Sequence, residues 1–374
     1  MADTLIADVP EVEEERIAVA SQAQLMWWRF RKHKLAVICG VAVILSYVGA
    51  LGADFLAYSD PRASDATRVL IPPQPIHVWD HGFHPYVYAV KSRTDPTTFR
   101  VVHDVDYSKK ISVCFFCHGF EYKFLGLIPT DIHLLGVSGT DAESSMFLLG
   151  TDASGQDMFS RLAYAARTSL FISLGAVVLI VILGIIFGAI SGYYGGVTDT
   201  IIQRFIELLA SLPKLPLWLG LAAAMPRDWN STKIYLALLL IISLLAWVGI
   251  AREVRGRFVS LSNEDFITAA ELSGTRSRRI MSAHMLPLMT SHLIATITLQ
   301  IPSMIAAETS LSFLGLGLRP PAISWGVMLQ QTQNLQSIAY APWLMLPAIP
   351  VIVIILAFNF LGDGLRDAAD PYGV

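Results

Sequence analysis

The chain has 374 residues, of which 54% are hydrophobic and only 15% are charged. Soluble globular domains carry about 25% charged residues, so this composition excludes an ordinary soluble domain. The formal net charge of −3 gives no basis for nucleic-acid binding. Because the apolar residues are gathered in runs close to the thickness of a bilayer, the sequence predicts an integral membrane protein.

The apolar runs predict an all-α polytopic membrane protein. The third run is interrupted by LPKLP, whose two prolines lack the N–H of a regular helix and predict a kink. Six transmembrane helices are expected, at about Leu35–Phe55, Leu170–Ser191, Ile201–Met225, Ile234–Ala251, Leu288–Phe313 and Trp343–Leu361.

Basic residues near the helix ends predict the orientation. They place the N-terminus in the cytoplasm, and six crossings return the C-terminus to the same side. The first 34 residues are polar and too long for the start of a cleaved signal peptide, so the first helix is expected to remain as an anchor. The basic residues are Arg29, Arg31, Lys32 and Lys34 before the first helix, and Arg252, Arg255, Arg257, Arg276, Arg278 and Arg279 after the fourth.

These assignments divide the chain into a cytoplasmic tail over residues 1–34, a first transmembrane segment over 35–57, an extracytoplasmic insertion over 58–148 and a transmembrane domain over 149–374. The insertion is expected to be small and β-rich. Its stretch YVYAVKSRTDPTTFRVVHDV alternates around an Asp-Pro turn and predicts a β-hairpin. The stretch ISVCFFCHGFEYKFLGLIP predicts a further strand or two.

Two motifs in the insertion suggest cofactors, and we expect neither cofactor to be bound. CFFCH, from Cys114 to His118, has the spacing of covalent haem attachment, and a membrane redox protein is the remote alternative that it leaves open. A local disulfide or two free thiols is favoured instead, although side chains three apart on a strand point to opposite faces.

A second cluster, of His77, His81 and His84, could bind Zn²⁺ or Ni²⁺. It lacks a carboxylate or cysteine at a recognisable spacing. The chain also carries no Walker A sequence, no nucleophile elbow and no catalytic dyad. We therefore expect no metal, no cofactor and no enzyme activity in this chain itself.

The charged stretch Ser262–Leu288 lies between two apolar runs. Placing its charged side chains at the centre of a bilayer would cost on the order of 20 kcal/mol, so it is expected to be cytoplasmic. Ser262 or Asn263 is a suitable N-cap, acidic residues follow in the first turn, and Gly274 suits the position after the last helical residue. A helix over about 263–273 is predicted.

Small residues, Ala269, Ala270 and Gly274, leave one side of this helix almost bare, so that a partner could approach closely. Phe266 and Ile267 offer apolar anchors. An amphipathic surface helix without a partner is the alternative that the local pattern leaves open.

TAAELSGTRSRRIMSAHMLP resembles the coupling-loop signature of ABC importer permeases, which reads EAA, three residues, G, nine residues and I-x-L-P. Ala269, Ala270, Gly274 and Pro287 match it, whereas Thr268 replaces the usual Glu and His284 the usual Ile. The departures make Thr268 a poor candidate for an essential charged contact and leave the small-residue side intact.

Further segments are similar to C-type permeases of the dipeptide, oligopeptide and nickel transporter family. They run from about residue 149 to 371 in the family's order, and the insertion is similar to that of the microcin C permease branch. The segments are LGTDASGQDMFSRLAYAARTSL, SGYYGGVTDTIIQRFIELLASLP, ETSLSFLGLGLRPPAISWG and FNFLGDGLRDAADP.

The resemblance implies the permease subunit of an ATP-driven peptide importer in the bacterial inner membrane, surrounded by lipid. It implies a homologous B-type permease as partner, two cytoplasmic ATPase subunits that bind ATP and Mg²⁺, and a periplasmic peptide-binding protein. The helix at about 263–273 would be the coupling helix, with Phe266, Ile267, Ala269, Ala270, Gly274 and Pro287 as its contact residues. The same machinery carrying nickel or another small solute is the alternative.

Four charged residues are candidates for the pore or the outer cap. Asp152, Asp157 and Arg161 precede the second helix and could form an ion-paired cap or a docking surface for the binding protein. Glu308 lies near the end of the fifth helix, where an acid is a functional candidate. We expect it to be hydrated at the outer interface or bonded within the bundle.

Overall fold

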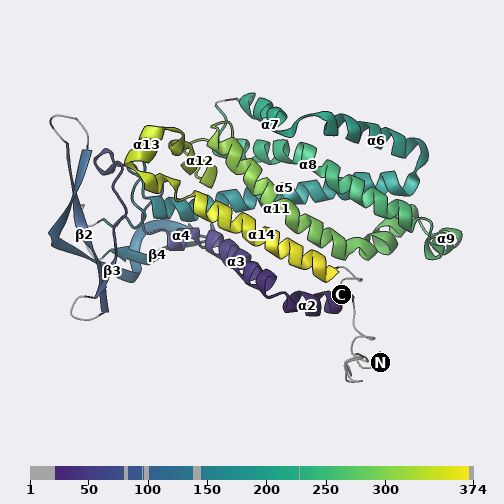
Figure 1. The fold of residues 1–374 in the computed structure, drawn as a ribbon, viewed down its shortest axis with the longest axis horizontal. Coiled ribbons are helices and arrows are strands. Elements are labelled where there is room, and N and C mark those ends of the chain that lie inside the picture. The colour runs from purple at the N-terminus through teal and green to yellow at the C-terminus, as the bar shows by residue number, and fades with distance from the viewer. Residues whose placement is uncertain are drawn as a thin grey trace, which may run out of the picture.

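The computed structural model describes residues 22–79, 83–94, 96, 101–137, 145–226 and 228–369. Long helices run side by side along the molecule, with a β-sheet at one end (Figure 1). We call this the sheet end, and the opposite end, where helix α9 projects, the α9 end. Five helices in the described part are long and apolar enough to cross a membrane, and a bent helix pair makes a sixth if it counts as one span. The expected helical membrane domain with a small β-rich insertion is thereby confirmed.

The chain enters the described region through α2, Gln22–Lys32, a helix that the sequence analysis did not predict within the polar tail. Helix α3, Lys34–Leu51, then runs toward the sheet end and continues into the short α4, Ala53–Leu56. Helix α2 packs against the end of the last helix, α14, through Phe30 and Ala368. The start of the described chain and its end therefore lie together, away from the sheet (Figure 1).

Helices α5, Met158–Tyr194, and α8, Ser231–Leu261, form the centre of the bundle. Both extend well beyond the expected bounds, because polar residues continue each helix past its apolar run. Three glycines four residues apart on α5 let the two backbones approach closely, as small residues do in membrane helices. A Cβ at Gly188 would lie 2.5 Å from the carbonyl oxygen of Ala251. The other two are Gly184 and Gly192.

The expected kink at LPKLP is a complete break. Helix α6, Gly196–Ser211, ends before the first proline, and α7, Lys214–Ala223, begins after it at an angle of 80°. Pro213 caps α7, and Pro216 falls in its first turn, where a missing N–H leaves no intrahelical bond unmade. The pair runs back from the α9 end toward the sheet end (Figure 1).

After α8 the chain forms α9, Asp265–Leu272, at the tip of the α9 end. It returns through short helical turns into α11, Thr290–Phe313, which carries Pro302 in its interior. The turns are α10, Ser277–Arg279, the π-helical η2, Ile280–Met285, and the 3₁₀ turn η3, Leu286–Met289.

Between α11 and the last helix, α14, Ala348–Ala369, the chain folds into short helices at the sheet end. The first of these, α12, is largely buried and begins at the capping residue Ser324. The set comprises α12, Trp325–Gln330, η4, Gln331–Gln333, α13, Leu335–Tyr340, and η5, Pro342–Met345.

The insertion folds into an antiparallel sheet in the order β1-β2-β3-β4. The predicted hairpin is confirmed as β2 and the first half of β3. The second half of β3 pairs with β4, so the predicted further strands are one continuation and one new strand. The strands are β1, His77–Trp79, β2, Phe83–Thr94, β3, Val101–Phe124, and β4, Ile128–Val137, and the turn η1, Ala66–Arg68, precedes them.

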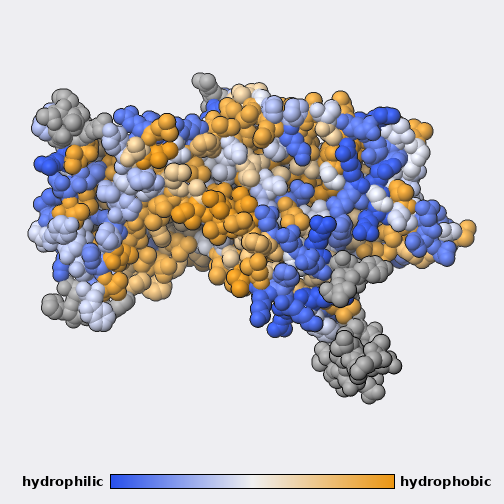
Figure 2. All heavy atoms as spheres, in the orientation of Figure 1, coloured by the Kyte–Doolittle hydropathy of each residue, from blue (hydrophilic) through white to orange (hydrophobic). Residues whose placement is uncertain are grey.

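The surface divides into three zones along the long axis. Figure 2 shows hydrophobic residues over the middle of the helices and hydrophilic residues gathered at the sheet end and toward the α9 end. Exposed apolar side chains lie on the outward faces of α3 and α14, among them Ile38, Ile44, Ile352 and Val353. This is the pattern of a bundle whose middle faces lipid and whose two ends face water.

Candidate functional site

Helix α9 begins two residues later than the sequence analysis predicted. Its N-cap position is Glu264, whose side chain makes no capping bond. Ser262 and Asn263, the predicted N-caps, both donate side-chain hydrogen bonds back to the carbonyl oxygen of Val259. They satisfy the last turn of α8 instead of the first turn of α9, so the N-cap prediction was wrong.

The other end of α9 is as predicted. Gly274 has a φ of 76°, the left-handed conformation that glycine adopts at little cost. Its N–H donates to the carbonyl of Glu271 at 2.9 Å, and the N–H of Thr275 donates to the carbonyl of Ala270 at 3.1 Å. These two bonds are those of a Schellman motif, which satisfies the last carbonyls of the helix and turns the chain sharply.

Three contacts hold α9 on its own chain. Ile267 is 1% exposed and packs into the main apolar core, so it cannot be the partner anchor that the sequence analysis expected. The hydroxyl of Tyr193, at the end of α5, donates to Oε1 of Glu271 at 2.9 Å. Ala270 is partly buried against the same core. These contacts fix the orientation of α9 relative to α5 and α8.

The outward side of α9 follows from the inward position of Ile267. At about 100° per residue, Asp265, Ala269 and Leu272 point away from the bundle. Leu272 is 85% exposed and Phe266 43% exposed. Sequence reasoning missed Leu272, although its place five residues after an inward Ile267 would have put it on the far side. The outward side therefore pairs a small residue with a large apolar one.

The segment after α9 is also accessible. Gly274 is exposed, and a Cβ there would meet no atom within 4 Å. Pro287, in η3, is exposed as well. A hollow of about 610 Å³ beside Gly274 is lined by Ser273, Thr275, Arg276, Arg278 and Arg279. Four of the expected contact residues face outward: Phe266, Ala269, Gly274 and Pro287. Ile267 is buried, and Ala270 is partly buried.

At the sheet end, Asp152 and Arg161 form a buried ion pair. Nη1 of Arg161 donates to Oδ2 of Asp152 at 2.6 Å, and Nε2 of Gln331 donates to the same oxygen at 3.0 Å. Asp152 is 1% exposed and Arg161 5% exposed. Of the two expected roles, the burial matches an ion-paired cap and leaves neither side chain available as a docking surface.

Asp157 caps the first turn of α5. Its carboxylate accepts hydrogen bonds from the backbone N–H of Ser160 and from the hydroxyl of Tyr58, each at 2.7 Å. Burial raises the pKa of Asp157 from 3.8 to about 6, although both hydrogen bonds act in the opposite direction. Burial, and then the charge of Asp157, raise the pKa of Tyr58 well above 10. The hydrogen bond from Tyr58 to Asp157 therefore connects the insertion to the helix bundle.

A third set of hydrogen-bonded charged residues lies at the sheet end, and the sequence analysis missed it. Nη2 of Arg167 donates to Oδ2 of Asp54 at 2.6 Å, and the hydroxyl of Tyr164 donates to Oδ1 of the same carboxylate. Asp54 is 7% exposed. An acid at the end of the first expected helix, Leu35–Phe55, was the only local signal, and its partners lie more than a hundred residues along the chain.

Glu308 is fully buried within the bundle. It accepts hydrogen bonds from the hydroxyls of Ser169 on α5 and Ser312 on α11, each at 2.9 Å. The hydroxyl of Ser169 also accepts a hydrogen bond from the backbone N–H of Trp325. Glu308 is therefore bonded within the bundle, as one of the two expected placements had it, and not hydrated at the outer interface. Its hydrogen bonds and those of Ser169 join α5, α11 and α12.

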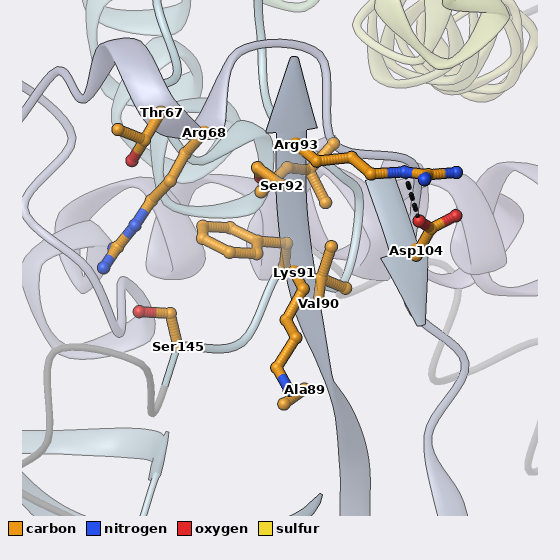
Figure 3. Close-up of a pocket in the computed structure, with 11 residues that line it drawn as sticks. Thr67, Arg68, Ala89, Val90, Lys91, Ser92, Arg93, Asp104 and Ser145 are labelled. Atoms are coloured by element: carbon orange, nitrogen blue, oxygen red, sulfur yellow. Dashed lines mark ion pairs between the residues drawn. The ribbon is translucent and has the colours of Figure 1, made fainter. Parts of the chain in front are cut away.

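The insertion contains a cavity of about 580 Å³ between β2 and the loops before and after the sheet. Figure 3 shows Arg68 and Ser145 across from the strand, with Arg93 turned toward Asp104. Nε of Arg93 lies 2.9 Å from Asp104, and Nζ of Lys91 lies 2.7 Å from Asp106. Arg68, the third cation of the lining, lies with its Nε 3.0 Å from Oδ2 of Asp65. Because each of the three cations is paired with a carboxylate, the cavity has no strong excess of charge.

The described residues of the two cofactor motifs lie on strands of the sheet. Cys114 and Cys117 are joined in a disulfide. Phe116, between them, has a φ of 55°, which interrupts the regular alternation of side chains along the strand. The two cysteine side chains can therefore meet, although on a regular strand they would point to opposite faces. Neither thiol is then available for haem attachment. His77 stacks on Tyr86, His81 lies outside the described residues, and the described residues contain no group of three metal ligands.

Comparisons with known proteins agree on one family. The model of the binding-protein-dependent transport system inner membrane component matches residues 184–372, and that of the N-terminal TM domain of oligopeptide transport permease C matches residues 21–73. The oligopeptide transport system permease protein OppC of Haemophilus influenzae is 38% identical over 243 residues, which are 65% of this chain and 75% of that protein.

Two further comparisons concern a second relative and a solved structure. The dipeptide transport system permease protein DppC of Bacillus subtilis is 38% identical over 224 residues, which are 59% of this chain and 68% of that protein. A chain from the MetNI methionine ABC transporter in an inward-facing conformation has a TM-score of 0.43 at 15% identity and covers 57% of this chain and 98% of its own length.

Proposed function

The chain belongs to the family of binding-protein-dependent transport system inner membrane components, and from this premise we propose that it is the C-type permease of an ATP-driven peptide importer. It forms half of the translocation pore with a homologous B-type permease. Two ATPase subunits bind ATP and Mg²⁺ on the cytoplasmic side, and a periplasmic peptide-binding protein delivers the cargo. The names of the relatives, oligopeptide and dipeptide permeases, support a peptide cargo.

The observation that carries this proposal is the outward side of α9. The helix lies beyond the apolar zone, and its inner side is held by Ile267 and by the Tyr193–Glu271 bond. Its outer side presents Ala269 and the 85%-exposed Leu272. A helix that packs on its own chain with one side and presents a small residue beside an exposed leucine on the other suits insertion into a groove of another protein. We assign that groove to an ATPase subunit.

The proposed orientation places the α9 end in the cytoplasm of the bacterium and the sheet end in the periplasm. The basic residues before α3 and after α8 support it, as does the position of α2 and the end of α14 away from the sheet. ATP-driven closure of the ATPases would move α9, and the bundle would then switch between inward and outward access. The ATPases can do so because ATP binding gives their two states different free energies.

The test is to truncate the exposed leucine. Leu272→Ala removes a side chain that burial in a groove would stabilise by ~2 kcal/mol, so the ATPase subunits should bind the permease about thirtyfold more weakly. Ala269→Trp should block docking by its volume. The measurements are the affinity of the ATPases for the reconstituted permease and the hydrolysis of ATP stimulated by the loaded binding protein.

Leu335→Ala is the matched control. Leu335 is a leucine with 82% exposure, on α13 at the sheet end, so its truncation should leave ATPase affinity unchanged. Wild-type affinity and wild-type stimulated hydrolysis in both Leu272→Ala and Ala269→Trp would show that α9 is a surface helix without a partner. Binding of a different cargo with intact coupling would contradict only the assignment of peptide.

A further inference from the structure

The tip of the β3–β4 hairpin is unusually apolar. Strands β3 and β4 are joined by the three residues Leu125, Gly126 and Leu127. Leu125 is 53% exposed, Leu127 81% and the following Ile128 62%. Turns are normally made of glycine, proline, asparagine, aspartate and serine, which suit their backbone angles and face water. Two leucines and an isoleucine at one exposed tip therefore need a separate explanation.

The backbone holds these side chains outward. Leu125 has a φ of 50°, in the left-handed region that side chains with a Cβ adopt only at a cost, and Gly126 has a φ of 74°. The backbone N–H of Gly126 donates to the carbonyl oxygen of Lys123, and that of Leu127 donates to the carbonyl oxygen of Phe124, so the turn is tight. A leucine kept in this conformation with its side chain half exposed is suited to an apolar environment outside the chain.

The hairpin is attached to the sheet end of the first membrane helix. His133, which is 1% exposed, has its Nδ1 3.0 Å from the carbonyl oxygen of Asp54 on α4. The rings of Phe116 and Phe55 lie 6.0 Å apart. At Gly119 the strand passes so close to His133 that a Cβ would not fit. The position of the hairpin relative to α4 is therefore fixed by packing.

The attachment places the hairpin next to α4, at the end of the lipid-facing side of α3. Helix α4 continues α3, whose outward side exposes Ile44 and Val48. The ring of Tyr122 packs on His133 at 4.9 Å, and Phe124 follows two residues later, about 7 Å farther along a strand. In Figure 2 the hydrophobic zone continues over the lower side of the molecule toward the sheet.

The flanking residues have the chemistry of a membrane interface. Phe120, Tyr122 and Phe124 are aromatic, and the exposed Glu121 and Lys123 alternate with them. Aromatic rings and lysines are enriched where a protein crosses from hydrocarbon to headgroups, since each has an apolar body and a polar end.

We propose that the tip, Leu125–Ile128, inserts into the lipid interface of the leaflet at the sheet end. The occupant is the bilayer surface, reached by continuity with the lipid-facing side of α3. The hairpin then holds the insertion down on the membrane beside the bundle. This inference needs the chain to be a membrane protein and does not depend on the cargo or on the ATPases.

The test places one fluorescent label on the tip. Cys114 and Cys117 are joined and Cys39 is buried, so a new cysteine in Leu127→Cys is the accessible thiol for an environment-sensitive nitrobenzoxadiazole label. Tyr107→Cys is the control, because Tyr107 lies on the same strand, β3, and is 74% exposed. The chain is purified with its accompanying subunits and reconstituted in phosphatidylethanolamine–phosphatidylglycerol vesicles.

Doxyl-labelled lipids and aqueous iodide serve as the two quenchers. A tip in the interface, some 5–10 Å below the headgroup surface, should be quenched by doxyl lipid at least about threefold more than the label at position 107, and less by iodide. Doxyl quenching of a label in Ile128→Cys should fall to the control level when Leu125→Asn and Leu127→Asn are added. Strong iodide quenching at position 127 would overturn the proposal. Protection from both quenchers would also overturn it, because the tip would then be covered by protein.

Discussion

The charged residues at the start of α5 and those around α9 are used in opposite ways. At the sheet end, Asp152, Asp157 and Arg161 are at most 5% exposed, and each has a bonded partner. At the α9 end, acidic residues and arginines around α9 are exposed. Charged residues that look alike in the sequence are therefore buried in ion pairs and hydrogen bonds at the start of α5, whereas those around α9 remain accessible to a partner.

Packing explains this difference. A buried charge is tolerated only with a partner and further hydrogen bonds. At the sheet end, the start of α5 and the segment just before it bond two distant parts of the chain, at Tyr58 and at Gln331. Helix α9 is held by two apolar side chains, Ile267 and Ala270, and by one hydrogen bond to Tyr193. Mutations at the sheet end should therefore change stability, and mutations on the outward side of α9 should change coupling alone.

The largest expected effect is at the buried ion pair. Arg161→Met leaves Asp152 buried without its cation and should lower the free energy of unfolding by about 3–5 kcal/mol. Arg204→Met is the control, since Arg204 pairs with Glu207 on the exposed side of α6 and should cost less than about 1 kcal/mol. Thermal unfolding in detergent measures both. Equal unfolding midpoints for the two variants would contradict the expected difference in stability between the buried and the exposed ion pair.

A pH dependence should follow from Asp157. Because its pKa in the folded state is about 6, above the ordinary 3.8, the folded protein holds this proton more tightly than the unfolded chain. Its contribution to stability is therefore full below about pH 4 and is lost as the pH rises through 6, with a limit of about 3 kcal/mol. Asp157→Asn should flatten this part of the curve of unfolding midpoint against pH. A variant curve parallel to that of the wild type would contradict the assignment.

The next effect concerns Glu308. Glu308→Ala leaves the hydroxyls of Ser169 and Ser312 without their acceptor and should destabilise the bundle by about 2 kcal/mol. Glu308→Gln keeps an acceptor and should cost clearly less. The measurement is again the unfolding midpoint, together with uptake. If both variants unfolded like the wild type while uptake was lost, Glu308 would have a role in transport and not in holding the helices together.

The smallest expected effect is at the attachment of α9. Tyr193→Phe removes the hydrogen bond to Glu271, worth about 0.5–1 kcal/mol, so amide hydrogens of α9 should exchange roughly two- to fivefold faster. Global unfolding should be unchanged. Tyr194→Phe is the control on the neighbouring residue. Loss of the whole bundle's stability in Tyr193→Phe would show that the α9 end is as tightly integrated as the sheet end.

Part of the site was predictable because its signals are local. The motif around Ala269 and Gly274 placed α9, and the left-handed φ at Gly274 matches the expected position after the helix. The inward side of α9 was not predictable, since it depends on how Ile267 meets the core formed by residues far along the chain. For the same reason the outward Leu272 was found only in the structure.

By itself, the sequence determined the membrane class, the approximate helices and the hairpin, because the length of an apolar run and its alternation are properties of neighbouring residues. The tertiary structure alone decided which charges are buried. Asp152 acquires Gln331, 179 residues away, and Asp54 acquires Arg167, 113 residues away. It also decided that the cysteines join, through the left-handed backbone at Phe116. Burial and pairing depend on which distant segments come together, and no local pattern of side chains specifies that.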